Sequence, residues 1–288
     1  MTFAFGLLLA ALSGSAVSGV SRHRSDDEAE VLARPAPEVR AASVERAVAN
    51  LGHTERQIEH TSFWLLGSSH PIAANFVSRG EEFSVSFQDP NLYAGLATAI
   101  TPDGYLITAA HMVRPYMCVI GWSEGRESIA PVRVVHVEND RHPGAEYAII
   151  KADGVHLEPA PWGVVGTVQE KLYASAWEQK PSFRRIILDG EVTTREGAAV
   201  TGLGRVVATD IPFYRGDSGG GVFSADGHFV GIVVCFYVPW STDVVSRLIF
   251  APDRQMIFGH IDADRERANR INQSPDPTSG LRPTAGHL

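Results

Sequence analysis

With 288 residues, of which 44% are hydrophobic and 20% are charged, the chain has the composition of an ordinary soluble globular protein. Its 33 acidic and 25 basic residues give a net charge of −8, which excludes a broad basic face for nucleic acid and a general attraction to anionic membranes. The 27 glycines and 17 prolines favour many short strands joined by turns over long helices.

The first element in chain order is an uncharged, apolar stretch over residues 3–20. With small residues such as Ala16 and Ser18 near its end, it predicts a signal peptide over residues 1–20 and therefore export to the periplasm or the cell exterior. A retained membrane anchor is one alternative, because the stretch approaches the length that spans a bilayer. A misassigned start or a disordered leader is another, because no Lys or Arg precedes the stretch. Membrane association is expected through residues 3–20 only.

Residues 21–61 are predicted to form a linker followed by a short helix. Residues 21–42 are charged, contain Pro35 and Pro37, and show no apolar period, as is typical of a linker. Ser43 can cap a helix, which Gly52 is expected to interrupt. The apolar positions of this helix, at spacings of four, three and seven, are Val44, Val48, Leu51 and Ile58.

Residues 62–258 have a different sequence pattern, in which short β-type runs are separated by turn signals. Examples of these signals are Pro-Asp-Gly at residues 102–104 and Asp-Gly at residues 189–190 and 226–227. Many short strands without helical patterns between them predict an all-β sandwich or barrel. Residues 259–288 then become polar, with no apolar period, and predict a disordered tail without a second globular domain.

The strongest chemical signal is the Gly-Asp-Ser-Gly-Gly run at residues 216–220, which follows Arg215. A hydroxyl nucleophile must be exposed beside backbone N–H donors, and flanking glycines allow both the unusual turn and the close approach of a substrate. In such a turn Ser218 is the nucleophile, and the N–H groups of Gly216 and Ser218 form the oxyanion hole. Taken alone, the run also suits an ordinary surface turn.

Ser218 needs a general base, because a free hydroxyl is a poor nucleophile at neutral pH. The chain has eleven histidines, so a single histidine carries little weight. His111 differs from the others in its context: a β-type run over residues 105–108 is followed by two alanines and then the histidine. We therefore interpret His111 as the candidate base.

Together, Thr-Ala-Ala-His at residues 108–111 and Gly-Asp-Ser-Gly-Gly at residues 216–220 resemble the two signature motifs of the chymotrypsin/trypsin-like peptidases, in the same order. The run over residues 101–108 and Thr209-Asp210 before the serine are similar to the bacterial HtrA-type branch. The resemblance covers about residues 92–255. It implies two six-stranded antiparallel β-barrels packed together, with the N-terminal helix and flexible tails outside them.

The third catalytic residue departs from the family pattern. The resemblance places an Asp at the start of a strand that here reads Glu-Tyr-Ala-Ile-Ile-Lys over residues 146–151. A carboxylate at that position orients the histidine through its Nδ1–H. Glu146 is the preferred candidate, Asp140 in the preceding loop is the alternative, and a surface glutamate at a strand end is the interpretation without function.

The resemblance also implies a specificity pocket near Pro212, six residues before the nucleophile, and Tyr214. No acidic residue stands at position 212, so a preference for an aliphatic or aromatic substrate side chain is expected. Asp210 lies two residues before position 212, so it is not expected to bind the substrate side chain. Asp217 is present, but no Arg-Ile-Val-Gly-Gly site precedes residue 92, so activation through a new N-terminus is not supported.

Cys118 and Cys235 are the only cysteines, which are too few for a disulfide scaffold. We expect them in different barrels, buried and unpaired, with a disulfide as the alternative. Neither has a histidine at ligand spacing, so no metal site is expected.

Two functions are compatible with these residues. The first is an exported serine endopeptidase that acts on a polypeptide substrate without a cofactor, with ester hydrolysis as a related activity. The second is a catalytically weak or inactive protease-fold protein used for binding or sensing, which the replacement of Asp by Glu146 favours. A contact between His111 Nδ1 and the carboxylate of Glu146 or Asp140 is the feature that would distinguish them.

Overall fold

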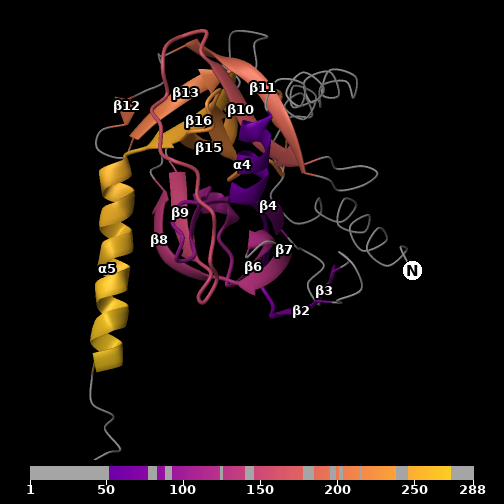
Figure 1. Ribbon diagram of the computed structural model, residues 1–288, viewed down its shortest axis with the longest axis vertical. Helices are drawn as coiled ribbons and strands as arrows, with labels where there is room; N and C mark the ends of the chain where they lie inside the picture. Colours follow the sequence, from indigo (N-terminus) through magenta and orange to yellow (C-terminus); the bar gives the residue numbers. More distant parts are fainter. Residues whose placement is uncertain are drawn as a thin grey trace, which may run out of the picture.

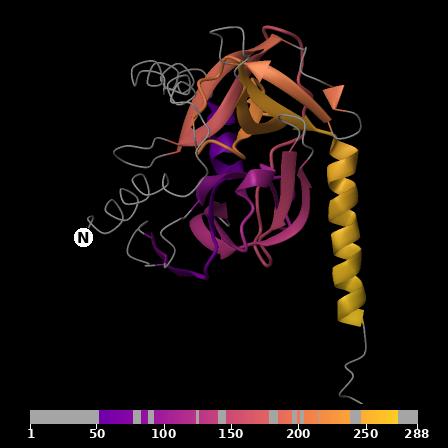
Figure 2. The same cartoon turned by 180° about the vertical axis from the view of Figure 1, so that it is seen from behind.

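The computed structural model describes residues 52–76, 83–87, 93–123, 126–139, 146–177, 185–194, 199–200, 204–214, 216–237 and 246–273. Over these residues the chain forms two curved antiparallel β-sheets stacked one above the other, with a short helix beside their junction and a long helix along one side (Figure 1). Figure 2 shows the same two layers from behind, with the long helix extending past the lower sheet.

The first sheet contains seven strands in the order β7-β6-β1-β4-β5-β9-β8. Their bounds are β1 (Ser62–Ser68), β4 (Tyr93–Ala99), β5 (Tyr105–Thr108), β6 (Tyr116–Ser123), β7 (Arg126–Pro131), β8 (Arg133–Asn139) and β9 (Glu146–Lys151). The inner strand β5 is buried along its whole length, as its aromatic and aliphatic sequence predicts. A separate hairpin consists of β2 (Ile72–Phe76) and β3 (Phe83–Phe87).

The two edge strands of the first sheet, β7 and β8, are consecutive in the chain, with only Val132 between them. At this bend the Val132 N–H donates to the carbonyl oxygen of Met117 on β6 at 3.1 Å. The sheet therefore curls until its two edges are joined by the chain itself. Counted as one bent strand, β7 and β8 reduce the seven strands to the six of a barrel.

The second sheet has the order β11-β10-β14-β15-β16-β13-β12, and an additional pairing of β11 with β13 closes six of its strands into a ring. The bounds are β10 (Lys171–Trp177), β11 (Arg185–Thr194), β12 (Ala199–Val200), β13 (Gly204–Thr209), β14 (Gly221–Ser224), β15 (Phe229–Tyr237) and β16 (Ser246–Pro252). The predicted all-β fold with two packed antiparallel barrels is confirmed.

One hydrophobic core joins the two barrels. Tyr147 of the first barrel stacks on Phe250 of the second, with ring centroids 5.8 Å apart and planes at 7°. Trp162, in the connection between the barrels, packs edge-on against Phe229 at 5.0 Å. Aromatic pairs of this kind contribute about 0.5–1.5 kcal/mol each beyond their buried area. The two barrels therefore form one cooperative unit, and any site at their junction has a rigid base.

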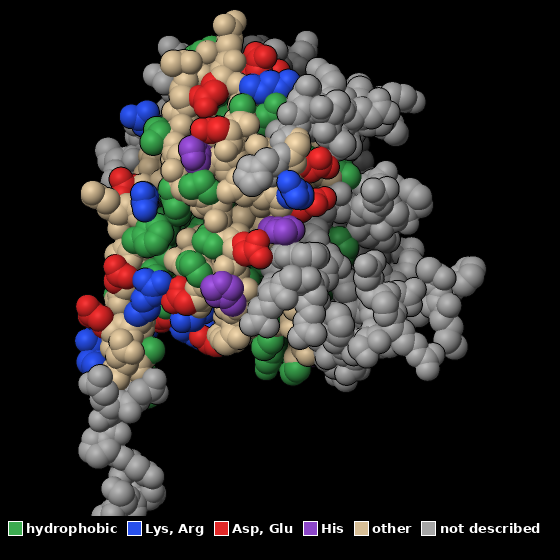
Figure 3. Space-filling model, viewed as in Figure 1, with side chains coloured by type: hydrophobic (Ala, Val, Ile, Leu, Met, Phe, Trp, Pro, Cys, Tyr) green, Lys and Arg blue, Asp and Glu red, His purple; other side chains and the backbone are tan. Residues whose placement is uncertain are grey.

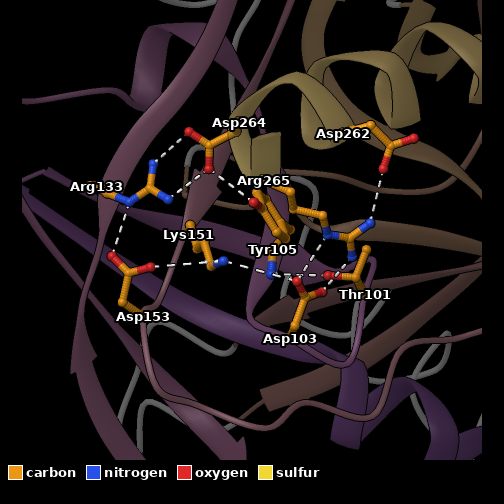
Figure 4. Close-up of polar contacts among 9 residues, drawn as sticks. All are labelled: Thr101, Asp103, Tyr105, Arg133, Lys151, Asp153, Asp262, Asp264 and Arg265. Carbon is orange, nitrogen blue, oxygen red and sulfur yellow. Dashed lines mark hydrogen bonds and ion pairs between the residues drawn. The ribbon is translucent and has the colours of Figure 1, made fainter. Parts of the chain in front are cut away.

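The long helix α5 (Arg254–Gln273) leaves the second barrel and is fastened to the first by side-chain contacts (Figure 4). Asp264 accepts hydrogen bonds from Arg133 at 2.6 and 3.0 Å and from the Tyr105 hydroxyl at 2.9 Å. Arg265 donates to Asp103 at 2.7 and 3.1 Å. Since Asp264 is buried, these bonds supply the partners that a buried carboxylate needs.

The prediction of a disordered tail over residues 259–288 is wrong for residues 259–273, which continue α5. The buried face of this helix is formed by Ile257, Ile261 and Asp264, at spacings of four and three. Because the third position is an aspartate held by ion pairs, no apolar period extends into the tail. Residues 274–288 lie outside the described residues.

The N-terminal predictions fall largely outside the described part of the chain. This holds for the signal or anchor segment over residues 1–20, for the linker and for the helix start at Ser43. The described helix α4 (His53–Thr61) begins after Gly52, whose φ is 46°, and it buries Ile58 in the core. Among the described helices, none combines the length and the apolar character needed to cross a membrane.

Cys118 lies on β6 of the first barrel and Cys235 on β15 of the second, as expected. Cys118 is buried and free, and burial raises the pKa of its thiol to about 12. It is therefore a small hydrophobic residue rather than a reactive thiol. The side chain of Cys235 is outside the described part.

Candidate active site

His111 lies in η1 (Ala110–Met112), a single 3₁₀ turn directly after the buried strand β5. The end of β5 is fixed by Thr108, whose Oγ1 donates to the carbonyl oxygen of Leu96 on β4 at 2.7 Å. Ala109 and Ala110 are buried, and their small side chains let the chain turn against the core. The His111 side chain is 43% exposed, so the turn presents the imidazole to solvent from a rigid base.

Glu146 is the first residue of β9 and contacts His111. Pairing of β5 with β9 sets Thr108 opposite Ala148, so Glu146 lies two residues further along, beside the turn that carries the histidine. Its Oε1 accepts a hydrogen bond from His111 Nδ1, and its side chain is only 16% exposed. A proton held on Nδ1 leaves Nε2 of the neutral ring free to accept another proton. The alternative candidate, Asp140, is outside the described residues.

Ser218 lies in the turn between β13 and β14, held between the two barrels. Its carbonyl oxygen accepts the Leu96 N–H of the first barrel at 2.9 Å, and the next residue, Gly219, donates its N–H to Val233 of the second at 2.8 Å. The Ser218 side chain therefore lies at the junction of the two barrels. Its turn is bonded to Leu96 of β4, the same residue that Thr108 contacts.

The Ser218 turn and the His111 turn meet over Gly95 of β4. A Cβ atom placed on Gly95 would lie 2.6 Å from Cε of Met112, the residue after His111, and 2.9 Å from the carbonyl oxygen of Ser218. The two turns thus cover the same point of the strand. Within the described residues no hydrogen bond joins the Ser218 hydroxyl to His111. Such bonds are often long in free enzymes and shorten when substrate binds.

Two glycines give the Ser218 turn its shape. Gly216 and Gly219 have φ values of 98° and 82°, in the region that side chains other than glycine rarely adopt. A Cβ on Gly219 would also lie 2.0 Å from the carbonyl oxygen of Leu96. The N–H groups of Gly216 and Ser218 make no hydrogen bond to the part of the chain that is described, so both donors can serve an anionic oxygen.

The predicted pocket residues Pro212 and Tyr214 are both buried beside this turn. The Tyr214 N–H donates to Oδ2 of Asp217 at 2.8 Å, so the carboxylate before the nucleophile is bonded within its own loop. Asp210 is exposed and accepts the Glu191 N–H at 2.6 Å. Both carboxylates therefore hold the protein's own loops, and these contacts give neither of them a role in binding a substrate.

Sequence reasoning missed Arg247, which lies on β16 within electrostatic reach of Tyr214 and Asp210. No local motif marks this residue, because only the pairing of β16 with β13 brings it beside the loop before Ser218. The described residues contain no group of three or more His, Cys, Asp or Glu side chains that could hold a metal ion.

Two packed antiparallel barrels, with a histidine–carboxylate pair on the first and a Gly-Asp-Ser-Gly-Gly turn at their junction, define the class of chymotrypsin-type double-barrel proteins. Residues 95–232 match the model of the trypsin-like peptidase domain family. Among solved structures, it is similar to the crystal structure of Deg5, with a TM-score of 0.49, 14% sequence identity, and coverage of 70% of this chain and 88% of that one. No curated protein sequence matches the chain significantly.

Proposed function

We propose that this chain is a serine endopeptidase that hydrolyses peptide bonds through an acyl-enzyme on Ser218. The observation that carries the proposal is the hydrogen bond between His111 Nδ1 and the Glu146 carboxylate. It supports a role of Glu146 as the acid that orients the base, a position where the family pattern has Asp. The N–H groups of Gly216 and Ser218, which make no hydrogen bond to any described residue, supply a second, independent argument.

In the proposed mechanism His111 Nε2 takes the proton of the Ser218 hydroxyl while Oγ bonds to the scissile carbonyl carbon. The carbonyl oxygen becomes an anion that the N–H groups of Gly216 and Ser218 stabilise. As the carbon–nitrogen bond breaks, His111 returns the proton to the leaving amine, and a water then repeats the sequence to release the acyl group. Glu146 stabilises the imidazolium that forms in both halves, and this chemistry needs no cofactor.

The proposed substrate is a polypeptide outside the cytoplasm. Export is inferred from the apolar residues 3–20 of the sequence, which are also the only segment proposed to associate with a membrane. On the face shown in Figure 3, acidic and basic side chains are mixed rather than gathered by sign, which does not favour a nucleic-acid partner.

A second candidate is a protease-fold protein that binds peptides with little turnover. The observation in its favour is that no hydrogen bond joins Ser218 to His111 among the described residues. The contact between His111 and Glu146 argues against it, since a binding protein has no need to hold the imidazole in one tautomer.

A fluorophosphonate probe tests the proposal, because it labels only an activated serine. We expect labelling of the wild-type protein and its loss in Ser218→Ala. Ser69→Ala is a matched control, because Ser69 is exposed and its hydroxyl also contacts a histidine, His70 at 3.1 Å, but without a glycine turn. Absence of labelling in folded wild-type protein refutes the proposal. Labelling with ester but no peptide hydrolysis would limit the activity to a different acyl transfer.

A further inference from the structure

The interior of the second barrel contains a cation at the end nearest the Ser218 loop. Arg247 on β16 pairs with Thr209, the last residue of β13, and the chain then continues toward Ser218. Because side chains alternate along a strand, Arg247 faces the same side as Ile249. Ile249 belongs to the cluster inside the second barrel that also contains Ile211 and Phe213. The guanidinium therefore lies at the mouth of this barrel.

The guanidinium of Arg247 has no hydrogen-bonded or ion-paired partner among the described residues. Its Nε is buried without a hydrogen-bond acceptor, and Arg247 makes no hydrogen bond or ion pair with any described residue. Burial lowers the pKa of Arg247, and the nearby Tyr214 and Asp210 oppose this effect only in part. Asp210 is within electrostatic reach but uses Oδ1 to accept the Glu191 N–H. The buried Nε of Arg247 has no hydrogen-bond acceptor among the described residues, so the anion of a ligand could complete the site.

The residues around Arg247 are those already placed beside the nucleophile. Tyr214 lies four residues before Ser218, and its N–H is bonded to Asp217, which precedes the serine directly. Across the sheet, Arg247 faces Phe236 of β15, and Val233 on the same strand accepts the N–H of Gly219. The barrel mouth at Arg247 therefore lies beside the loop that carries Ser218, where a substrate side chain close to the attacked bond could enter it.

We propose that Arg247 is a specificity-determining residue that binds an acidic side chain, aspartate or glutamate, in the substrate residue immediately before the scissile bond. The proposal rests on the proposed peptidase function. It is an alternative to the sequence-based expectation of an aliphatic or aromatic preference, which considered only residues close to Ser218 in the chain and stays a prediction. The planar guanidinium suits a carboxylate because its N–H groups can form two parallel charge-assisted hydrogen bonds.

The test uses the full-length protein and fluorogenic peptides that differ only in the residue before the scissile bond: Glu, Asp, Gln, Leu or Lys. Wild-type kcat/KM for Glu or Asp should exceed that for Gln by about tenfold to a hundredfold, as expected for a hydrogen-bonded charge in a buried site. Gln is the informative comparison because it has the shape of Glu without the charge. Lys should be the poorest substrate, because it would bring a second cation to Arg247.

Variants assign the preference to Arg247. Arg247→Met keeps much of the side-chain volume and should remove the discrimination between Glu and Gln while cleavage after Leu persists. Arg247→Lys keeps the positive charge but loses the planar group that can donate two parallel hydrogen bonds, and it should retain part of the preference for acidic residues. Arg205→Met is the matched control, because Arg205 is an exposed arginine on the neighbouring strand β13, and it should behave as wild type.

The outcomes separate this proposal from the proposed function. Equal cleavage after Glu, Gln and Leu by the wild-type protein overturns the role of Arg247 and leaves the peptidase function intact. An acidic preference that survives in folded Arg247→Met overturns it as well. If wild type neither cleaves any peptide nor reacts with fluorophosphonate, the peptidase function fails and the proposed specificity fails with it. The wild-type comparison of Glu with Gln decides the matter even if a variant does not fold.

Discussion

Replacement of Glu146 by Gln tests whether the contact with His111 supports catalysis. The variant keeps the size of the side chain, and its amide oxygen can still accept the Nδ1–H, but it lacks the negative charge that stabilises an imidazolium. Loss of an orienting carboxylate of this type lowers kcat by about 10⁴ in the reference serine peptidases. Here the His111 side chain is 43% exposed, so water offsets part of the loss. We expect kcat to fall by about 10²- to 10³-fold.

The assay is peptide turnover at neutral pH, together with the rate of fluorophosphonate labelling. Glu146→Asp is a graded variant, because the loss of one methylene retracts the carboxylate by about 1.5 Å, and its rate should lie between those of wild type and Glu146→Gln. Glu158→Gln is the control, since Glu158 makes a similar contact with His60 at 3.0 Å on the surface. A Glu146→Gln rate within about threefold of wild type, combined with a large loss in Asp140→Asn, would refute the assignment and identify Asp140 as the acid.

Two predictions concern the stability of the structure that carries the site. Gly219→Ala should destabilise the fold by about 3 kcal/mol or more in urea titrations, because its Cβ would lie 2.0 Å from a carbonyl oxygen at a φ of 82°. Gly154→Ala, at a φ of 75° with no atom within 4 Å, should cost only about 1 kcal/mol, and equal losses would contradict this explanation. Asp264→Asn should cost about 1–2 kcal/mol at pH 7, a figure reduced because Arg133 is 39% exposed. The hydrogen bond from Arg133 lowers the pKa of Asp264 below 3.8, so this stabilisation is present above about pH 4 and is lost as the pH falls through the folded-state pKa. Thermal melts from pH 7 downward should therefore show a shallower acid loss in Asp264→Asn, and an unchanged slope would count against the ion pair.

The parts of the fold that follow from local patterns were predicted from the sequence. Short alternating runs and Asp-Gly turns indicated strands, and the number of barrels came from the family resemblance. The extent of helix α5 was missed, because its attachment depends on Arg133 and Tyr105, which are distant in sequence from the Asp264 that they bind. A search for regularly spaced apolar residues misses a helix whose buried face includes a charged residue held by an ion pair.

The same distinction holds for the candidate site. His111 and Ser218 could be singled out because each lies in a short run with a recognisable pattern, and the family resemblance to that pattern pointed to Glu146, with Asp140 as the alternative. Their catalytic roles remain a prediction for the probe and the variants to test. Arg247 could not be found in this way, since its neighbours are defined by strand register and burial, which no local pattern reveals.

The attachment of α5 also has a consequence for how the molecule is made. Tyr105 and Asp264 are 159 residues apart, and Asp103 and Arg265 are 162 residues apart. Contacts of such high sequence separation form late, because a long loop must close before they contribute. During synthesis the first barrel emerges long before the helix that completes its outer surface. The two-barrel domain should therefore reach its full resistance to unfolding only once α5 has been synthesised, which delays the final assembly of the site until residue 273 has been added.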